Sequence, residues 1–155
     1  MTDHDLEKEL RLDKQLCFAL YGAAHAFTRA YKPLLSPLGL TYPQYVVMMA
    51  LWEEDDVAVK ALGEKVGLDS GTLSPLLKRL EQVGYVSRRR DAADERQVFI
   101  TLTAQGRALK TRAVDVLRGI GSQTGCDIGE IESLRDSLTR LKRQLDAVKG
   151  PNEEG

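Results

Sequence analysis

The sequence predicts a mainly α-helical fold that carries one small β-hairpin. Apolar residues recur at helical spacing from Val59 to Val66, and Gly67 ends that run. A second helix follows at once, because Asp69, Ser70 and Thr72 are polar types that favour a helix start. Residues 85–87 and 98–102 alternate β-branched or aromatic side chains with others around a polar loop, which predicts two paired strands. Helix, turn, helix and hairpin in this order indicate a winged helix-turn-helix domain.

The N-terminal segment is expected to form one long helix over residues 5 to 31. It is amphipathic up to Gln15, but the stretch LCFALYGAAHAFTRAY from Leu16 onward puts apolar and small residues on nearly every face. Such a helix must be covered on all sides. A chain of 155 residues has little material for that cover. We therefore expect this helix to pack against a second copy of itself.

Proline and glycine separate this helix from the next. Pro33, Pro37 and Gly39 are expected to break the chain. A new helix is expected near Thr41, which suits the N-cap position. The sequence EEDD at 53–56 is expected to end that helix as a solvated charged turn.

Two more helices are expected after the hairpin, one over 104 to 121 with Thr103 as its cap and one over 130 to 148. The last helix has apolar residues every three or four positions, a coiled-coil-like spacing. These residues are Ile131, Leu134, Leu138, Leu141, Leu145 and Val148. We assign residues 1–40 and 104–150 to dimerisation helices, residues 41–103 to the winged helix-turn-helix domain, and residues 151–155 to a flexible tail.

The charge of the chain is balanced overall but unevenly distributed. With 22 basic and 23 acidic side chains the net charge is −1, which argues against indiscriminate binding to polyanions. Residues 75–112, however, hold nine basic and four acidic side chains, a net charge of +5. This asymmetry is expected if one face meets phosphates.

Several other classes of protein find no support in the sequence. The N-terminus MTDHDLEKEL is acidic, unlike a secretory signal, and no apolar run reaches the roughly 20 residues that cross a bilayer, so we expect a cytoplasmic protein without a membrane partner. Two cysteines are too few for a disulfide scaffold. Only two histidines and no glycine-rich phosphate loop are present, so neither enzyme activity, a metal site nor a cofactor is predicted.

The second helix of the helix-turn-helix carries side chains suited to DNA. Short hydroxyls near its start can contact base edges, and two cations one turn on can hold phosphates or guanines. These residues are Ser70, Thr72, Ser74, Lys78 and Arg79. The alternative is that the hydroxyls only cap the helix and the cations are solvated. Pro75 also leaves the start of the helix open, because it removes the hydrogen bond to the carbonyl of Gly71 unless the helix begins near Thr72.

The hairpin loop is basic as well. Four arginines lie within nine residues, and Arg88 and Arg90 alternate with Arg89, so these two point to one face of the sheet. An ordinary solvated hairpin would carry charges too, but this density favours nucleic acid.

The stretches SGTLSPLLKRLEQVGYVSR and DAADERQVFITLTAQG resemble the winged helix-turn-helix of the MarR family of bacterial transcriptional regulators. The resemblance covers most of the chain. It implies a homodimer that binds double-stranded, pseudo-palindromic operator DNA. It also implies that Arg96 inserts into the minor groove and that Asp94 orients it.

A lone cysteine in an apolar helix is usually inert packing. The arrangement of Cys17, Tyr21, Tyr31 and Tyr42, however, resembles the organic hydroperoxide-sensing, OhrR-type branch of the family. The resemblance implies that Cys17 is a redox-sensing thiol, that tyrosine O–H groups stabilise its thiolate, and that an organic hydroperoxide oxidises it to a sulfenic acid.

Helix geometry adds a constraint to this arrangement. Fourteen residues at about 1.5 Å each separate Tyr31 from Cys17 by roughly 21 Å, so a tyrosine that meets the thiol must come from the partner subunit. Tyr31 and Tyr42 could instead close the interface without chemistry. Cys126 resembles the second cysteine of two-cysteine members, which makes it a candidate resolving cysteine. Oxidation would then release the operator and derepress a peroxide-resistance gene.

Three other functions stay open at this point. A MarR-type repressor could be released by a small aromatic ligand in the interfacial pocket, with Cys17 structural. An enzyme would use Cys17 as the nucleophile of a thiol peroxidase. A helical adaptor would have no role on DNA.

Overall fold

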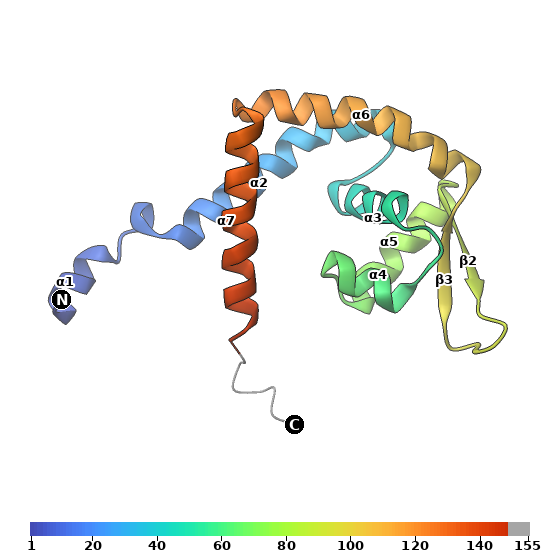
Figure 1. Cartoon of the computed structure of the whole chain (residues 1–155), viewed down its shortest axis with the longest axis horizontal. Helices are drawn as coiled ribbons and strands as arrows, with labels where there is room; N and C mark the ends of the chain where they lie inside the picture. The colour runs from blue at the N-terminus through green and yellow to red at the C-terminus, as the bar shows by residue number, and fades with distance from the viewer. Residues whose placement is uncertain (149–155) are drawn as a thin grey trace. The chain divides into compact units, whose positions relative to one another are not determined.

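The computed structural model describes residues 1–148 and confirms a mainly helical fold with one small antiparallel sheet (Figure 1). The predicted tail at 151–155 and residues 149 and 150 of the predicted dimerisation segment lie outside the described residues. The chain divides into two compact units, Met1–Ile120 and Gly121–Gly155.

The prediction of a single helix over residues 5 to 31 is wrong. The chain forms α1 (Asp3–Glu9), a 3-10 turn η1 (Leu12–Lys14) and then α2 (Leu16–Leu35). The break is stabilised by the side-chain amide of Gln15, which donates to the carbonyls of Glu9 at 2.7 Å and Arg11 at 3.0 Å. These bonds satisfy backbone acceptors at the end of α1, so the helix can stop there without exposing them.

The predicted break at Pro33 is also wrong. Pro33 lies inside α2, which continues to Leu35. In this last turn the proline removes one backbone hydrogen bond, to the carbonyl of Arg29. Only two residues of the helix follow the proline, so little of the helix is affected. The break occurs instead at the 3-10 turn η2 (Ser36–Leu38) and at Gly39, whose φ of 71° is the left-handed conformation that glycine favours.

The three helices of the DNA-binding region form as predicted. Thr41 and Gln44 make a reciprocal capping box at the start of α3 (Tyr42–Glu53). Gly67, with φ of 72°, ends α4 (Val59–Val66). The next helix, α5 (Ser70–Gln82), starts at Ser70 rather than Thr72, so Pro75 is inside it and leaves the carbonyl of Gly71 without its helical partner.

The sheet contains a strand that the sequence pattern did not indicate. The hairpin consists of β2 (Val86–Arg90) and β3 (Val98–Leu102), and β1 (Val57–Ala58) pairs with the other edge of β3 to give the order β1-β3-β2. Two residues are too few to show a strand period, which explains why β1 was missed. Strand β2 ends three residues later than predicted, so the run of arginines at 88–90 belongs to the strand.

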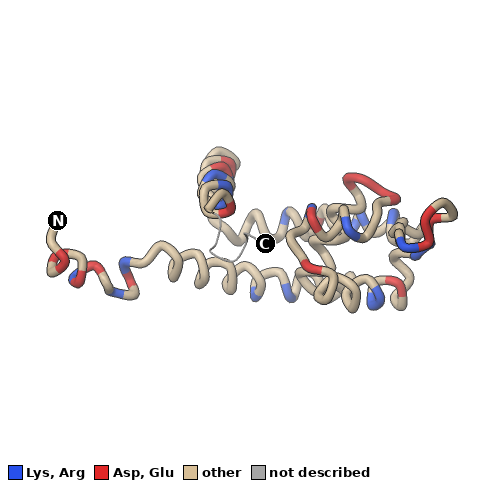
Figure 2. The backbone as a smooth tube through the Cα atoms, turned by 90° about the horizontal axis from the view of Figure 1, so that it is seen from below, with Lys and Arg blue, Asp and Glu red and all other residues tan. Residues whose placement is uncertain are grey.

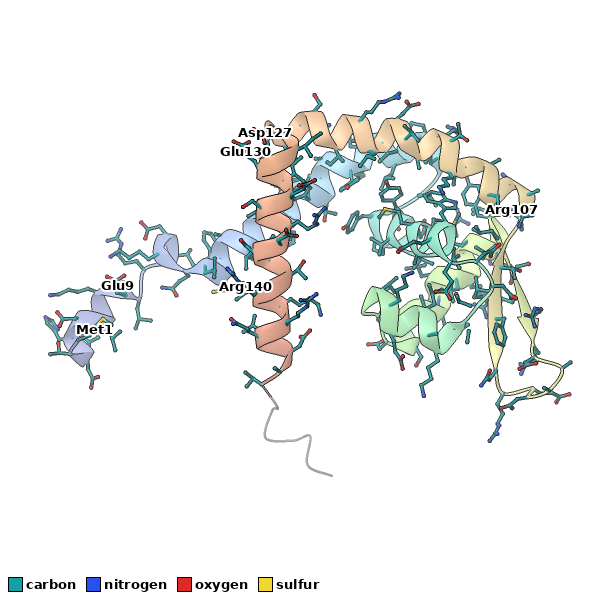
Figure 3. The ribbon with its side chains drawn as sticks, in the orientation of Figure 1. Met1, Glu9, Arg107, Asp127, Glu130 and Arg140 are labelled. Atoms are coloured by element: carbon teal, nitrogen blue, oxygen red, sulfur yellow. The ribbon has the colours of Figure 1, made fainter. Side chains whose placement is uncertain are left out.

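The turn that follows α3 is exposed over residues 53–56, as predicted, and two of its carboxylates also make contacts within the chain. Asp55 accepts a hydrogen bond from the backbone N–H of Leu102 at 2.8 Å and lies 3.6 Å from Arg107, which is labelled in Figure 3. Asp56, with φ of 55°, accepts from Arg89 at 2.9 Å. These carboxylates therefore tie the turn to the sheet and to the helix after it.

The core lies between α3, α5, the sheet and the start of α6 (Ala104–Thr124). Leu73, Leu77 and Leu80 of α5 are buried there, and two side-chain hydrogen bonds close the edges of the core. Trp52 donates its indole N–H to the carbonyl of Gly106 at 2.9 Å, and the Tyr85 hydroxyl donates to the carbonyl of Leu38 at 2.6 Å. The largest fully buried side chains include Val47, Met48, Leu51, Leu62, Leu73, Leu77, Leu80 and Ile100.

The last two helices start from side-chain caps. The Thr103 hydroxyl accepts from the N–H of Gly106 at 3.0 Å, as predicted for α6. Asp127 and Glu130, labelled in Figure 3, form the capping box of α7 (Ile128–Asp146), which begins two residues before its predicted start. The predicted apolar stripe of α7 is largely exposed on the single chain, since Leu134 and Leu145 are 57% and 63% exposed.

Gly106 supports a test of this packing. A Cβ atom at Gly106 would lie 2.0 Å from the carbonyl oxygen of Tyr85, so Gly106→Ala forces backbone apart. We expect it to lower the free energy of unfolding by about 3 kcal/mol. Gly121→Ala, in the same helix with nothing within 4 Å, should leave stability unchanged or raise it by up to about 1 kcal/mol. Denaturant unfolding of both variants measures this, and equal stabilities would contradict the packing.

Candidate nucleic-acid interface and thiol site

The exposed face of α5 carries most of the polar residues predicted to meet DNA. Ser70, Ser74, Lys78 and Arg79 are exposed, while the leucines on the opposite face are buried. The helix period of 3.6 residues produces this separation. The face is therefore free to enter a groove, with hydroxyls near the helix start and cations one turn further on.

Thr72 takes part in the cap of α5. Its backbone N–H donates to the Asp69 carboxylate at 2.8 Å. This bond, followed by one from the Thr72 side chain, holds the pKa of Asp69 below its ordinary value. The cap itself is the Asp69 carboxylate, and the Thr72 side chain is exposed, so its hydroxyl stays a candidate for base contact.

Two of the strand arginines make hydrogen bonds within the chain. Arg88 donates to the carbonyl of Ser74 in α5 at 3.1 Å, so it bridges the hairpin and α5. We call α5 the recognition helix because it carries residues predicted to contact DNA. Arg90 donates to the carbonyl of Glu95 at 2.9 Å and closes the hairpin loop. Both arginines are exposed beyond these bonds.

The loop tip holds an oriented arginine. Asp94 accepts from the backbone N–H and from the side-chain Nε of Arg96, both at 3.1 Å. The Arg96 side chain is nevertheless 92% exposed. One carboxylate oxygen therefore fixes the direction of the side chain and leaves its terminal nitrogens free to donate.

These elements enclose an open groove of about 1010 Å³. It lies between α4, α5 and the hairpin, and Ser70, Ser74, Arg88 and Arg96 are among its lining residues. The structure thus gathers residues from the recognition helix and the hairpin around one concave, partly basic surface.

The predicted sensing residues fall into two separate places. Cys17 lies in the first turn of α2 and is exposed on the chain. Tyr21, one turn further on, is 64% exposed and packs edge-on against His25, with ring centroids 4.4 Å apart. Tyr31 lies at the other end of the same helix, about 21 Å away by helical rise, so it does not meet the thiol of its own chain.

Tyr31 belongs to an aromatic cluster that joins α2 to α3. Its ring centroid lies 5.0 Å from that of Tyr42 and 5.7 Å from that of Tyr45, and Tyr45 in turn packs against Trp52. Burial, with smaller contributions from Tyr45 and Tyr42, raises the pKa of Tyr31 to about 12. Tyr31 is therefore a neutral hydroxyl donor at physiological pH.

The sequence analysis missed one member of this site. Tyr45 was not singled out, although its position three residues after Tyr42 puts both on one side of α3. Cys126, the other predicted thiol, is exposed in the turn before α7, where its Sγ donates to the carbonyl of Thr124 at 3.5 Å.

Two further features concern the described residues as a whole. No group of three or more histidine, cysteine or acidic side chains within residues 1–148 is arranged to hold a metal ion. No single helix among these residues is long and apolar enough to span a membrane. Leu16–Leu38 and Tyr42–Glu53 meet the length and composition test only as a pair bent by 68°.

Comparison with known proteins agrees with this geometry. Residues 29–113 match the family described as transcriptional regulator SarA/Rot. The chain is 51% identical over 142 residues to the HTH-type transcriptional regulator TtmR of Methylorubrum extorquens, covering 92% of this chain and 73% of that protein. It is 46% identical over 138 residues to the organic hydroperoxide resistance transcriptional regulator of Bacillus subtilis, covering 87% and 94%.

Solved structures of a transcriptional regulator also resemble this chain. Reduced AbfR bound to DNA, a Staphylococcus epidermidis protein, matches with a TM-score of 0.77 at 36% identity, covering 90% of this chain and 95% of that one. AbfR has also been solved in an overoxidized, DNA-bound form and in a disulfide form.

The fold, the exposed basic surface and these relatives define a winged helix-turn-helix transcriptional regulator that binds DNA. The chain belongs to the SarA/Rot family of transcriptional regulators, whose winged helix is of the MarR type.

The burial of Tyr31 gives a testable titration. Because its folded pKa of about 12 lies above the ordinary value of 10, stability linked to this group is fully present below pH 10 and is lost as the pH rises toward 12. Burial also raises the pKa of Tyr45. A titration followed by phenolate absorbance should therefore show late steps for both tyrosines, and Tyr31→Phe should remove one of them. Tyr21→Phe should keep both, and an unchanged late titration in Tyr31→Phe contradicts the assignment.

Proposed function

We propose that this regulator is a homodimeric, cytoplasmic repressor whose Cys17 thiol is oxidised by organic hydroperoxides, and that oxidation releases pseudo-palindromic operator DNA and derepresses a peroxide-resistance gene. One observation carries the proposal. An exposed thiol and a half-buried phenol lie at the two ends of one helix, and residues 18–28 between them include no lysine, arginine, aspartate or glutamate. In Figure 2 most of the tube of α2 is tan.

The position of the two groups on α2 suggests how a second copy completes the site. Fourteen residues correspond to about 3.9 helical turns, so Cys17 and Tyr31 lie near the same face of the helix. Two antiparallel copies that cross near Ala24, the midpoint, would bring each thiol beside Tyr31 of the partner subunit. Gly22, Ala23 and Ala24 are small enough for close approach, and no Cβ contact opposes a crossing at Gly22.

Exposed apolar residues support such a dimer. On the single chain Leu16, Phe18 and Phe27 of α2 are between 45% and 61% exposed, and Leu117 of α6 is 65% exposed. An exposed apolar surface of this extent marks an interaction site. The proposal assigns residues 1–40 and 104–150 to dimerisation and residues 41–103 to DNA binding.

The chemistry needs a stabilised thiolate. In an apolar interface a thiolate is costly unless hydrogen-bond donors meet it, and Tyr31 and Tyr42 are donors of this kind, with Tyr21 one turn from the thiol. The thiolate attacks one peroxide oxygen of an organic hydroperoxide, the O–O bond breaks, and an alcohol leaves once the alkoxide is protonated. The product is a sulfenic acid at Cys17.

Cys126 is the candidate resolving cysteine. Condensation of its thiol with the sulfenic acid of the partner subunit would form an intersubunit disulfide and release water. One relative supports this step, because AbfR has been solved in a disulfide form. The Bacillus subtilis relative, which is named for organic hydroperoxide resistance, supports the choice of oxidant.

On DNA, the proposal places α5 in the major groove and the hairpin against the adjacent minor groove. Ser70, Thr72 and Ser74 would meet base edges, and Lys78 and Arg79 would hold phosphates or guanines. Arg88, Arg90 and Arg96, with Asp94 orienting Arg96, would contact the backbone and minor groove. Oxidation would release DNA by displacing the two DNA-binding regions of the dimer from each other. About 2.7 kcal/mol of strain is enough to lower the affinity for DNA a hundredfold.

The thiol hypothesis has a direct test. Cumene hydroperoxide should release DNA from the wild-type dimer, while Cys17→Ser should stay bound at every oxidant concentration because the acceptor of the peroxide oxygen is gone. Fluorescence anisotropy with a duplex selected by the wild-type chain from a random pool measures this. Cys126→Ser should still lose DNA when the sulfenic acid forms. Release from the Cys17→Ser variant would sink the redox proposal and favour release by a small ligand.

The wing contact can be tested separately with Arg96→Ala. Loss of one minor-groove arginine should weaken binding to the selected duplex by about 1 to 3 kcal/mol and reduce the salt slope by about 1. Arg118→Ala removes an equally charged side chain, 77% exposed, from α6 and should change neither value. Unchanged affinity in Arg96→Ala would mean that the hairpin does not contact DNA through this arginine.

A further inference from the structure

A half-exposed ion pair joins the loop end of the hairpin strands to the segment that leads into the helix-turn-helix. One terminal nitrogen of Arg89 donates to both carboxylate oxygens of Asp56, at 2.9 Å each. The same guanidinium lies 4.7 Å above the ring centroid of Phe99. The three side chains come from β2, from the turn after α3 and from β3, so they connect elements that are distant in sequence.

The strand register shows why this contact crosses the sheet. Phe99 of the central strand pairs with Arg89 of β2 on one side and with Ala58 of β1 on the other. To reach Asp56, two residues before Ala58, the Arg89 side chain passes over Phe99. Strand β1 is only two residues long, so few backbone hydrogen bonds hold that edge. The Arg89 to Asp56 pair therefore adds a second tie between the two outer strands.

The Asp56 carboxylate is itself held in place. Its backbone has φ of 55°, a conformation that aspartate and asparagine tolerate better than most residues. Its N–H donates to Asp55 at 2.8 Å, and Asp55 also accepts from Leu102 at the end of β3. Asp55 thus fixes the turn against the sheet, and Asp56 is presented toward the arginine.

Arg89 is also directed away from the proposed DNA contacts of its neighbours. Side chains alternate along a strand, so Arg89 lies on the opposite face of β2 from Arg88, which binds the recognition helix through the carbonyl of Ser74. We propose that Asp56 and Arg89 are positioning residues: they set the direction of the hairpin relative to α5, and so the affinity for DNA, without contacting DNA. This inference rests on the proposed wing contact and is independent of the thiol.

Because Asp56 is negatively charged, the direction in which its removal changes DNA affinity shows which role it has. DNA is a polyanion, so removal of a nearby carboxylate should by charge alone tighten binding. Removal of a carboxylate that aims the hairpin should instead weaken it. The two roles of the same side chain therefore predict opposite outcomes.

The test compares Asp56→Asn with Glu54→Gln in the reduced full-length dimer, using the duplex selected by the wild-type chain. Asparagine accepts the same φ, so the substitution changes the ion pair and leaves the turn intact. We expect Asp56→Asn to bind about 5-fold more weakly. Glu54→Gln removes an equal charge two residues away and should bind as well as wild type or more tightly. Equal or tighter binding by Asp56→Asn would overturn the inference.

A double-mutant cycle separates positioning from direct contact. Arg89→Gln should weaken binding to the same extent as Asp56→Asn, and the double variant should be no weaker than either. Hydroxyl-radical footprints should lose protection beneath the hairpin and keep it beneath α5, while thermal unfolding shows an intact fold. Multiplicative losses would mean that Arg89 binds DNA itself, which contradicts the inference.

Arg96→Ala distinguishes failure of the positioning role from failure of the wing contact. If Arg96→Ala weakens binding and Asp56→Asn does not, only the positioning role fails. If neither variant weakens binding, the wing contact fails and the positioning role fails with it.

Discussion

The unbroken helix between Cys17 and Tyr31 is the constraint on which the account depends. Its rise separates the thiol from the Tyr31 phenol of its own chain by about 21 Å, and no rotamer change spans that distance. In the proposed dimer the same helix brings each thiol to the partner's phenols. Sensing then depends on dimerisation through α2. A monomer has both the thiol and the tyrosine, but only the proposed dimer brings them together.

The aromatic cluster at the end of α2 gives the site a physical link to the DNA-binding region. Tyr31 packs on Tyr42 and Tyr45 of α3, and Tyr45 contacts Trp52, whose indole N–H bonds to the start of α6. The connecting turn is held as well, since Arg112 donates to the carbonyl of Pro37 at 2.9 Å. A shift of Tyr31 must therefore move α3 or break this packing, and α3 lies in the same core as the recognition helix.

The sequence predicted the elements that local chemistry determines. Gly67, the Thr41 cap and the Thr103 cap each end or begin a helix through contacts within a few residues, so their patterns were sufficient. The break at Gln15 depends on a side chain reaching back to carbonyls, and the Asp56 to Arg89 pair joins residues 33 positions apart. Neither has a periodic signal. Cys17 is exposed on the single chain because, in the proposed dimer, its cover belongs to another molecule.

The central claim is that each thiol reacts with the help of the other subunit's tyrosine, and mixed dimers test it most directly. One heterodimer pairs a Cys17→Ser subunit with a Tyr31→Phe subunit, and the other pairs a doubly substituted subunit with a wild-type one. The rate of sulfenic acid formation by cumene hydroperoxide is measured in both. The account predicts wild-type reactivity of the remaining thiol in the first heterodimer and loss of reactivity in the second. The reverse result would mean that the site lies within one chain.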